Sequence, residues 1–152
     1  MEQTMSDTIF SLLVDLAERE RNTTSKRLAD ANAAVTTARA QLDMLERYLE
    51  DYQNRHGSRK PTTFGAETLR NFNAFILKLE AAITQQRREL AACEQGCNAV
   101  INAERAAQRK LLSFETMRDR RSEETRLLQQ LNNRRLEDQA AANSAMRTRL
   151  PR

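Results

Sequence analysis

The side chains best suited to chemistry in this 152-residue chain are two cysteines and one histidine. Cys93 and Cys97 lie four residues apart, which places both thiols on one face of a helix. A structural zinc ion takes four such ligands, but no second Cys or His pair accompanies them and His56 falls in a predicted loop. We therefore interpret both cysteines as small buried hydrophobic residues in a narrow helix interface, and we expect no metal or other cofactor.

No other pattern in the chain indicates catalysis. A Gly-rich phosphate loop and a nucleophile elbow are both absent from the sequence. Paired acids, such as Glu123 with Glu124 and Glu18 with Glu20, are better interpreted as exposed partners of neighbouring arginines. Two paired helices also provide no concave pocket for a substrate, so we expect that the protein is not an enzyme.

The cysteines belong to a longer series of positions that repeats every three and then four residues. Twelve of its fourteen residues are apolar or cysteine, and the series comprises Leu69, Phe72, Ile76, Leu79, Ile83, Gln86, Leu90, Cys93, Cys97, Val100, Glu104, Ala107, Leu111 and Phe114. The average spacing of about 3.5 residues is that of a left-handed coiled coil. This seam, as we call the series, requires a partner helix.

The composition favours long helices over a compact core. Ala, Glu, Lys, Leu and Arg account for 78 residues, whereas the chain has 3 Gly, 2 Pro and no Trp. No apolar run is long enough to span a membrane, so direct membrane insertion is not expected. The polar, acid-bearing segment Met1–Asp7 does not resemble a secretory signal, which predicts a cytosolic protein with reduced cysteines.

The predicted fold class is all-α, with two long helices forming an antiparallel coiled-coil hairpin in which the second helix is longer and overhangs the first. We assign residues 1–152 to a single coiled-coil domain: a first helix at about 7–54 with Ser6 or Asp7 as N-cap, a turn at about 55–65, a second helix at about 66–146 and a basic tail at 147–152. The polar, β-branched segment Asn22–Ser25 predicts local weakness in the first helix.

Matching the apolar layers of the two helices outward from the turn predicts their register. Tyr52 then faces Leu69, Ala38 faces Ile83 and Leu28 faces Cys93. The first helix ends opposite Phe114, so the second helix lacks a partner from Glu115 onward. A thin stripe of leucines (Leu127, Leu128, Leu131 and Leu136) lies there among arginines and acids. Such a helix either docks its stripe on another molecule or is a frayed, charged tail.

Two further features concern binding. The N-terminal turns are apolar on more than one side, from Ile9 to Leu16, so they need more than one neighbour and are a binding candidate.

The net charge of +4 divides into −4 for residues 1–54 and +8 for residues 55–152, so the two helices attract each other. The basic residues alternate with acids and lack an aromatic stacking platform, so we do not expect nucleic-acid binding.

Three short segments resemble the FliJ family of flagellar export proteins. They are Asp15–Glu20, the tyrosine pair Tyr48 and Tyr52 following Leu45, and Phe75–Gln85. The similarity covers roughly residues 7–115, and Phe75–Gln85 contributes most of it. The resemblance implies a protein of the flagellar type III export apparatus, folded like the central stalk of rotary ATPases and located in the cytoplasm, peripherally at the inner membrane.

The resemblance also implies three kinds of partner. These are the hexameric export ATPase, the cytoplasmic linker of the export-gate membrane protein, and export chaperones. Carried over by position, the gate-binding residues are Gln41, Leu45, Tyr48, Tyr52, Phe75, Leu79, Ala82 and Gln86. Relatives can have histidine at the position of Gln86, so this chain departs from the family pattern there. Alternatively, all eight residues broaden the core near the turn.

For the ATPase ring, we combine the resemblance with the two unpartnered ends of the helices. The predicted contacts are Ile9, Phe10, Leu13, Leu16, Arg118, Arg121, Leu128 and Arg135. Two other functions remain open: a stalk protein of a virulence-type III secretion system, or a generic coiled-coil scaffold that dimerises through its overhang.

Overall fold

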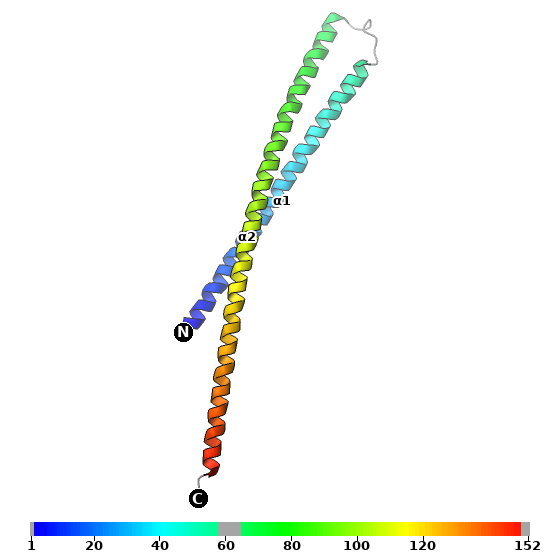
Figure 1. The fold of residues 1–152 in the computed structure, drawn as a ribbon. Coiled ribbons are helices and arrows are strands. Elements are labelled where there is room, and N and C mark those ends of the chain that lie inside the picture. The colour runs from blue at the N-terminus through cyan, green and yellow to red at the C-terminus, as the bar shows by residue number, and fades with distance from the viewer. Residues whose placement is uncertain (1, 58–64, 150–152) are drawn as a thin grey trace. The chain divides into compact units, whose positions relative to one another are not determined.

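The computed structural model describes residues 2–57 and 65–149, which form two helices (Figure 1). Helix α1 spans Glu2–Gly57 and helix α2 spans Ala66–Arg149. The two helices pack against each other in opposite directions, which confirms the predicted all-α hairpin. The predicted loop residues 58–64, the tail residues 150–152 and the side chain of His56 lie outside the described part of the chain.

Helix α1 begins at Glu2, more than one turn before the predicted N-cap at Ser6 or Asp7. Glu2 and Glu67 lie in the first turns of α1 and α2, and Arg147 and Arg149 lie in the last turn of α2, so their charges complement the helix dipoles. The segment Asn22–Ser25 is helical throughout, with Thr24 buried. It fits because a small threonine side chain can occupy a narrow interface between helices.

The chain divides into two compact units, which we describe separately. Unit 1 comprises Met1–Arg21 and Ala107–Arg152, and unit 2 comprises Asn22–Ala106. Each unit therefore contains part of α1 and part of α2. Neither described helix includes an 18-residue stretch apolar enough to cross a membrane.

The core of unit 2 is a narrow apolar seam between the helices. Leu42, Leu79 and Ile83 are its buried cluster, with Leu45, Leu49 and Leu90 packed against it. The predicted α2 seam is buried or half-buried at every position from Phe72 to Glu104. Leu69 is an exception to the prediction, because its side chain is 56% exposed.

The register in unit 2 differs from the predicted one by one layer. Tyr52 lies against Phe72 instead of Leu69, with ring centroids 6.1 Å apart. Ala38 lies against Gln86 instead of Ile83, because the Gln86 Nε2 donates to the Ala38 carbonyl at 3.1 Å. The predicted register would have placed Gln86 opposite the apolar Val35, whereas the observed one gives its amide an acceptor.

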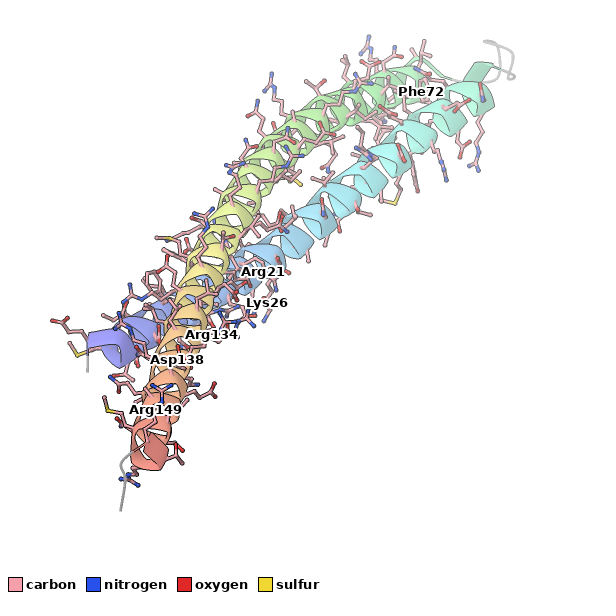
Figure 2. All side chains as sticks on the ribbon, turned by 60° about the horizontal axis from the view of Figure 1, so that its bottom comes forward. Arg21, Lys26, Phe72, Arg134, Asp138 and Arg149 are labelled. Carbon is pink, nitrogen blue, oxygen red and sulfur yellow. The ribbon has the colours of Figure 1, made fainter. Side chains whose placement is uncertain are left out.

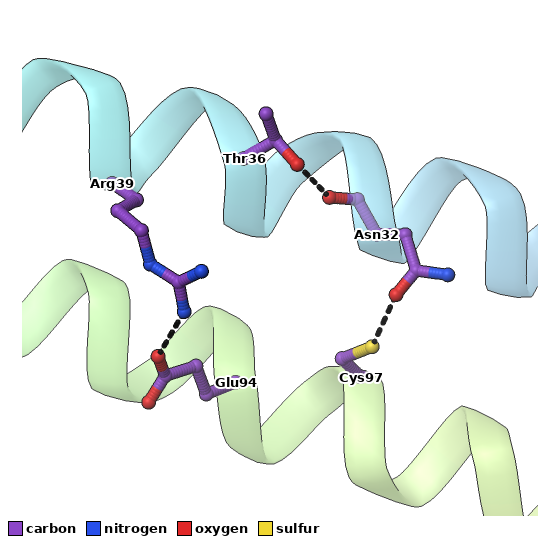
Figure 3. A network of polar contacts seen from close by, with 5 residues as sticks. All are labelled: Asn32, Thr36, Arg39, Glu94 and Cys97. Carbon is purple, nitrogen blue, oxygen red and sulfur yellow. Dashed lines mark hydrogen bonds and ion pairs between the residues drawn. The ribbon is translucent and has the colours of Figure 1, made fainter.

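Polar contacts across the helices of unit 2 agree with this register (Figure 3). Cys97 is buried and its thiol donates to Asn32 Oδ1 at 3.1 Å, whereas Leu28 had been predicted opposite Cys93. Arg39 forms an ion pair with Glu94 at 3.2 Å. The side chains of Arg39 and Glu94 are both exposed, so this ion pair contributes little stability. It nevertheless favours the observed register, because a shift of the helices would separate the two charges. Cys97 thus occupies a buried seam position as predicted, with an additional polar contact.

Unit 1 has a smaller core, formed by Val14, Ala17 and Leu111 with Phe114 packed against them. Lys110 and Glu20 form an ion pair across the two helices at 3.1 Å. Glu115, Arg121 and Thr125 are half-buried, and every described residue from Arg126 to Arg149 is exposed. The overhang therefore begins at Arg126 and not at Glu115, because α1 starts earlier and the register is shifted.

Stability should depend on the seam far more than on exposed apolar residues of the same helix. Ile83 is 4% exposed in the unit 2 core, whereas Leu77 is 67% exposed. We expect Ile83→Ala to lower the free energy of unfolding by about 2–4 kcal/mol, from lost burial plus the cavity left behind. Leu77→Ala should change it by less than about 0.5 kcal/mol. Urea unfolding followed by circular dichroism measures both, and equal losses would contradict the observed seam.

Candidate protein-binding surfaces

Four aromatic rings lie together in unit 2, and we call Tyr48, Tyr52, Phe72 and Phe75 the aromatic face. Tyr52 is at its centre: its ring centroid is 6.5 Å from that of Tyr48, 6.1 Å from that of Phe72 and 4.7 Å from that of Phe75. These spacings are those of favourable aromatic pairs. The rings therefore form one continuous cluster that joins α1 to α2.

The heptad pattern explains which of these rings are exposed. Tyr52 and Phe72 occupy seam positions and are half-buried. Tyr48 and Phe75 lie off the seam and are 56% and 40% exposed. Large exposed aromatic side chains held by neighbouring rings are typical of the anchor residues of protein interfaces, because little side-chain freedom is left to lose on binding.

Two contacts between α1 and α2 join members of the predicted gate-binding set in unit 2. Tyr52 contacts Phe75 at one end of the set, and Gln86 Nε2 donates to Gln41 Oε1 at 3.1 Å at the other. The remaining four differ in exposure: Tyr48 and Ala82 are exposed, Leu45 is half-buried and Leu79 is buried. Leu79 belongs to the core cluster, so it can only support the surface from below.

Sequence reasoning assigned Phe72 to the seam alone and did not select Met44. Phe72 stacks on Tyr52 and so belongs to the aromatic face as well. Met44 is 59% exposed and precedes Tyr48 by one helical turn. The sequence did contain a signal for Met44: it lies four residues before Tyr48, and both large side chains fall outside the seam.

The other side of unit 2 carries a more polar groove of about 240 Å³ between α1 and α2. Glu46 on α1 and Arg87 on α2 form an ion pair there at 3.0 Å. Glu50 and Glu80 also line the groove, above the apolar side chains of Leu49 and Ile83. No aromatic ring lines this groove, so the two sides of unit 2 present different chemistry.

Unit 1 carries an exposed apolar stripe on α1. Its members are spaced by four, three and four residues and are Met5, Ile9, Leu12 and Leu16. Of the predicted ATPase-binding residues, Ile9 and Leu16 belong to this stripe, whereas Phe10 and Leu13 are half-buried. The wide apolar surface of the N-terminal turns is thus partly covered within unit 1 and partly exposed.

The end of α2 in unit 1 presents the other predicted ATPase contacts. Arg118, Leu128 and Arg135 are exposed and Arg121 is half-buried. Leu127, Leu131 and Leu136 are also exposed, in the part of α2 where Figure 2 labels Arg134 and Asp138. The leucine stripe therefore has no cover within the described residues.

A hollow of about 470 Å³ in unit 1 lies where the start of α1 meets this part of α2. Asp7 and Phe10 line it from α1, and Arg118, Ser122, Thr125, Arg126 and Gln129 line it from α2. Arg126 donates to Glu123 at 2.6 Å, and this contact holds the pKa of the Glu123 carboxyl below its ordinary value. The two charges thus largely satisfy each other at this end of the hollow.

Comparison with known proteins identifies the family. The family model described as "Flagellar FliJ protein" matches residues 6–150, which includes parts of both units. The chain belongs to the FliJ family. It is 30% identical to the flagellar FliJ protein of Escherichia coli (strain K12) over 138 residues, covering 91% of this chain and 94% of that protein.

A second FliJ protein is similarly related. The flagellar FliJ protein of Salmonella typhi is 30% identical over 139 residues, covering 89% of this chain and 92% of that protein. No solved structure matches the chain significantly. Among the residues that the structure describes, no group of three or more His, Cys, Asp or Glu side chains is placed to hold a metal ion.

Proposed function

We propose that the chain is a stalk component of the bacterial flagellar type III protein export apparatus. In this role it binds and stimulates the hexameric export ATPase, couples the ATPase to the export gate and binds export chaperones. Membership of the FliJ family and the two exposed surfaces, one in each unit, support the proposal. The match to flagellar proteins favours this function over a stalk of a virulence-type system.

The exposed end of α2 in unit 1 is the observation on which the proposal depends most. A single helix with every residue exposed from Arg126 to Arg149 is marginally stable alone and gains stability by docking its apolar stripe. Together with Ile9 and Leu16 on α1, it would enter the ATPase ring. A stalk that contacts successive ATPase subunits with different side chains biases their conformational equilibria and thereby stimulates hydrolysis.

The aromatic face of unit 2 is the proposed contact with the export gate. Its exposed rings, Tyr48 and Phe75, are suited to a pocket or groove on the cytoplasmic linker of the gate protein. A chain held in this way works at the cytoplasmic face of the inner membrane without inserting into it. Chaperone binding follows from the resemblance, and we assign no residues to it.

The experiment that tests the proposal measures ATP hydrolysis by the purified flagellar export ATPase while the full chain is titrated in. We expect the rate to rise and then saturate. Bovine serum albumin at the same concentrations is the control for nonspecific effects. A rate that does not differ from that of the ATPase with the control protein would contradict the proposal.

A further inference from the structure

The aromatic face of unit 2 continues onto the outer surface of α1. A shallow hollow of about 300 Å³ there is lined by six residues of one helix: Ala40, Asp43, Met44, Arg47, Tyr48 and Asp51. Tyr48 is shared between this hollow and the aromatic face. Met44 and Tyr48 are both more than half exposed, so the hollow has a substantial apolar surface.

The charged side chains around this hollow have no partner among the residues that the structure describes. Asp43, Arg47 and Asp51 form no ion pair or side-chain hydrogen bond with any residue in the described ranges 2–57 and 65–149. The groove on the other side of unit 2 differs, because its Glu46 is already paired with Arg87. Two carboxylates without a partner in the described ranges therefore flank an exposed apolar pair, with one guanidinium between them.

Charge complementarity indicates what would cover this surface. The hollow carries two acidic residues, Asp43 and Asp51, and Arg47 as its only base, a net charge of −1. An acidic or neutral partner would bury apolar surface at the cost of leaving these carboxylates desolvated and unpaired. A partner with apolar side chains on one face and Lys or Arg beside them would satisfy both features.

We propose that the segment bound at the aromatic face is a basic amphipathic one that also covers Met44 and places cations beside Asp43 and Asp51. This inference rests on the proposed role of the aromatic face in gate binding and names the chemistry of the partner. The apolar side of the segment packs on Met44 and Tyr48. Arg47 disfavours a cation at the centre of the hollow, so the cations are placed toward its two ends.

The test compares a double variant, Asp43→Asn with Asp51→Asn, with a matched control, Asp30→Asn. Asp30 is also an exposed aspartate of α1 in unit 2, but it lies outside the hollow. Calorimetric titration of the full chain with the cytoplasmic linker of the gate protein measures the affinity at low and at high salt. We expect the double variant to bind about tenfold more weakly at low salt, since two screened ion pairs are lost.

Three results support the inference together: the loss in the double variant, a smaller loss at high salt, and no loss in the Asp30→Asn control. Met44→Ala should bind about fivefold more weakly at either salt concentration, because it removes apolar contact only. All these side chains are exposed, so thermal unfolding should be unchanged. Unchanged unfolding excludes misfolding as the cause.

The results can separate this inference from the proposed function. If Tyr48→Ala weakens binding but the double variant binds like the native chain, the inference is wrong and the gate-binding role stands. If neither change affects binding, both the inference and the proposed surface are wrong. Failure of the native chain to bind the linker would overturn the gate-binding role and this inference with it.

Discussion

A chain that ends after Thr125 should no longer stimulate the export ATPase. The deletion removes the whole segment in which every described side chain is exposed, including the leucines Leu127, Leu128 and Leu131. It leaves the cores of both units in place, because Leu111 and Phe114 in unit 1 and Ile83 in unit 2 precede the cut. We expect ATP hydrolysis to fall to the rate of the ATPase alone.

Two controls show whether this loss is specific. The shortened chain should bind the gate linker with unchanged affinity, since the aromatic face belongs to unit 2. A full-length variant with Leu127, Leu128 and Leu131 changed to Ala keeps every charge and removes only the apolar stripe. It should lose most of the stimulation, because apolar anchors dominate protein interfaces. Full stimulation by the shortened chain would contradict the assignment of this segment to the ATPase.

Tyr48→Ala should cause the largest loss of gate-linker binding among single substitutions. Tyr48 is the most exposed ring of the aromatic face, and its contact with Tyr52 restricts its side chain. Binding a partner therefore costs Tyr48 little further conformational entropy. Truncating a central tyrosine of an interface typically costs at least about 2 kcal/mol, or about thirtyfold in Kd. Calorimetric titration with the linker measures this change.

The matched control is Tyr48→Phe, which keeps the ring and removes the hydroxyl. It should bind within about threefold of the native chain, because the contact between Tyr48 and Tyr52 is made by their rings, which phenylalanine retains. Neither variant should alter unfolding by more than about 1 kcal/mol, since the side chain is more than half exposed. Linker affinity that is insensitive to Tyr48→Ala would exclude the aromatic face as the gate contact.

The sequence predicted the two helices and most of the seam, because a repeat of 3.5 residues over many turns has one structural interpretation. It did not predict the register. Registers one layer apart bury nearly the same apolar residues, so the choice depends on individual contacts. In unit 2 the deciding contacts are the Gln86 amide with the Ala38 carbonyl and the Tyr52 ring with Phe72.

The binding surfaces were predictable where a bulky residue departs from the seam. Tyr48 and Phe75 stand out for this reason, and both are exposed in the structure. Leu79 could not be distinguished in this way, because it is a seam residue and is buried. The predicted start of the overhang was wrong in part because the predicted start of α1 was too late. The N-cap rule identifies possible helix starts, such as Ser6, but α1 already begins at Glu2.

The central claim is that one chain holds the export ATPase and the export gate at the same time, through surfaces in different units. The most direct test immobilises the gate linker and measures how much purified export ATPase is retained with and without the full chain. We predict that ATPase is retained only when the chain is present, that Tyr48→Ala strongly lowers retention, and that the deletion after Thr125 abolishes it. ATPase that displaces the chain from the linker, instead of joining it, would contradict the claim.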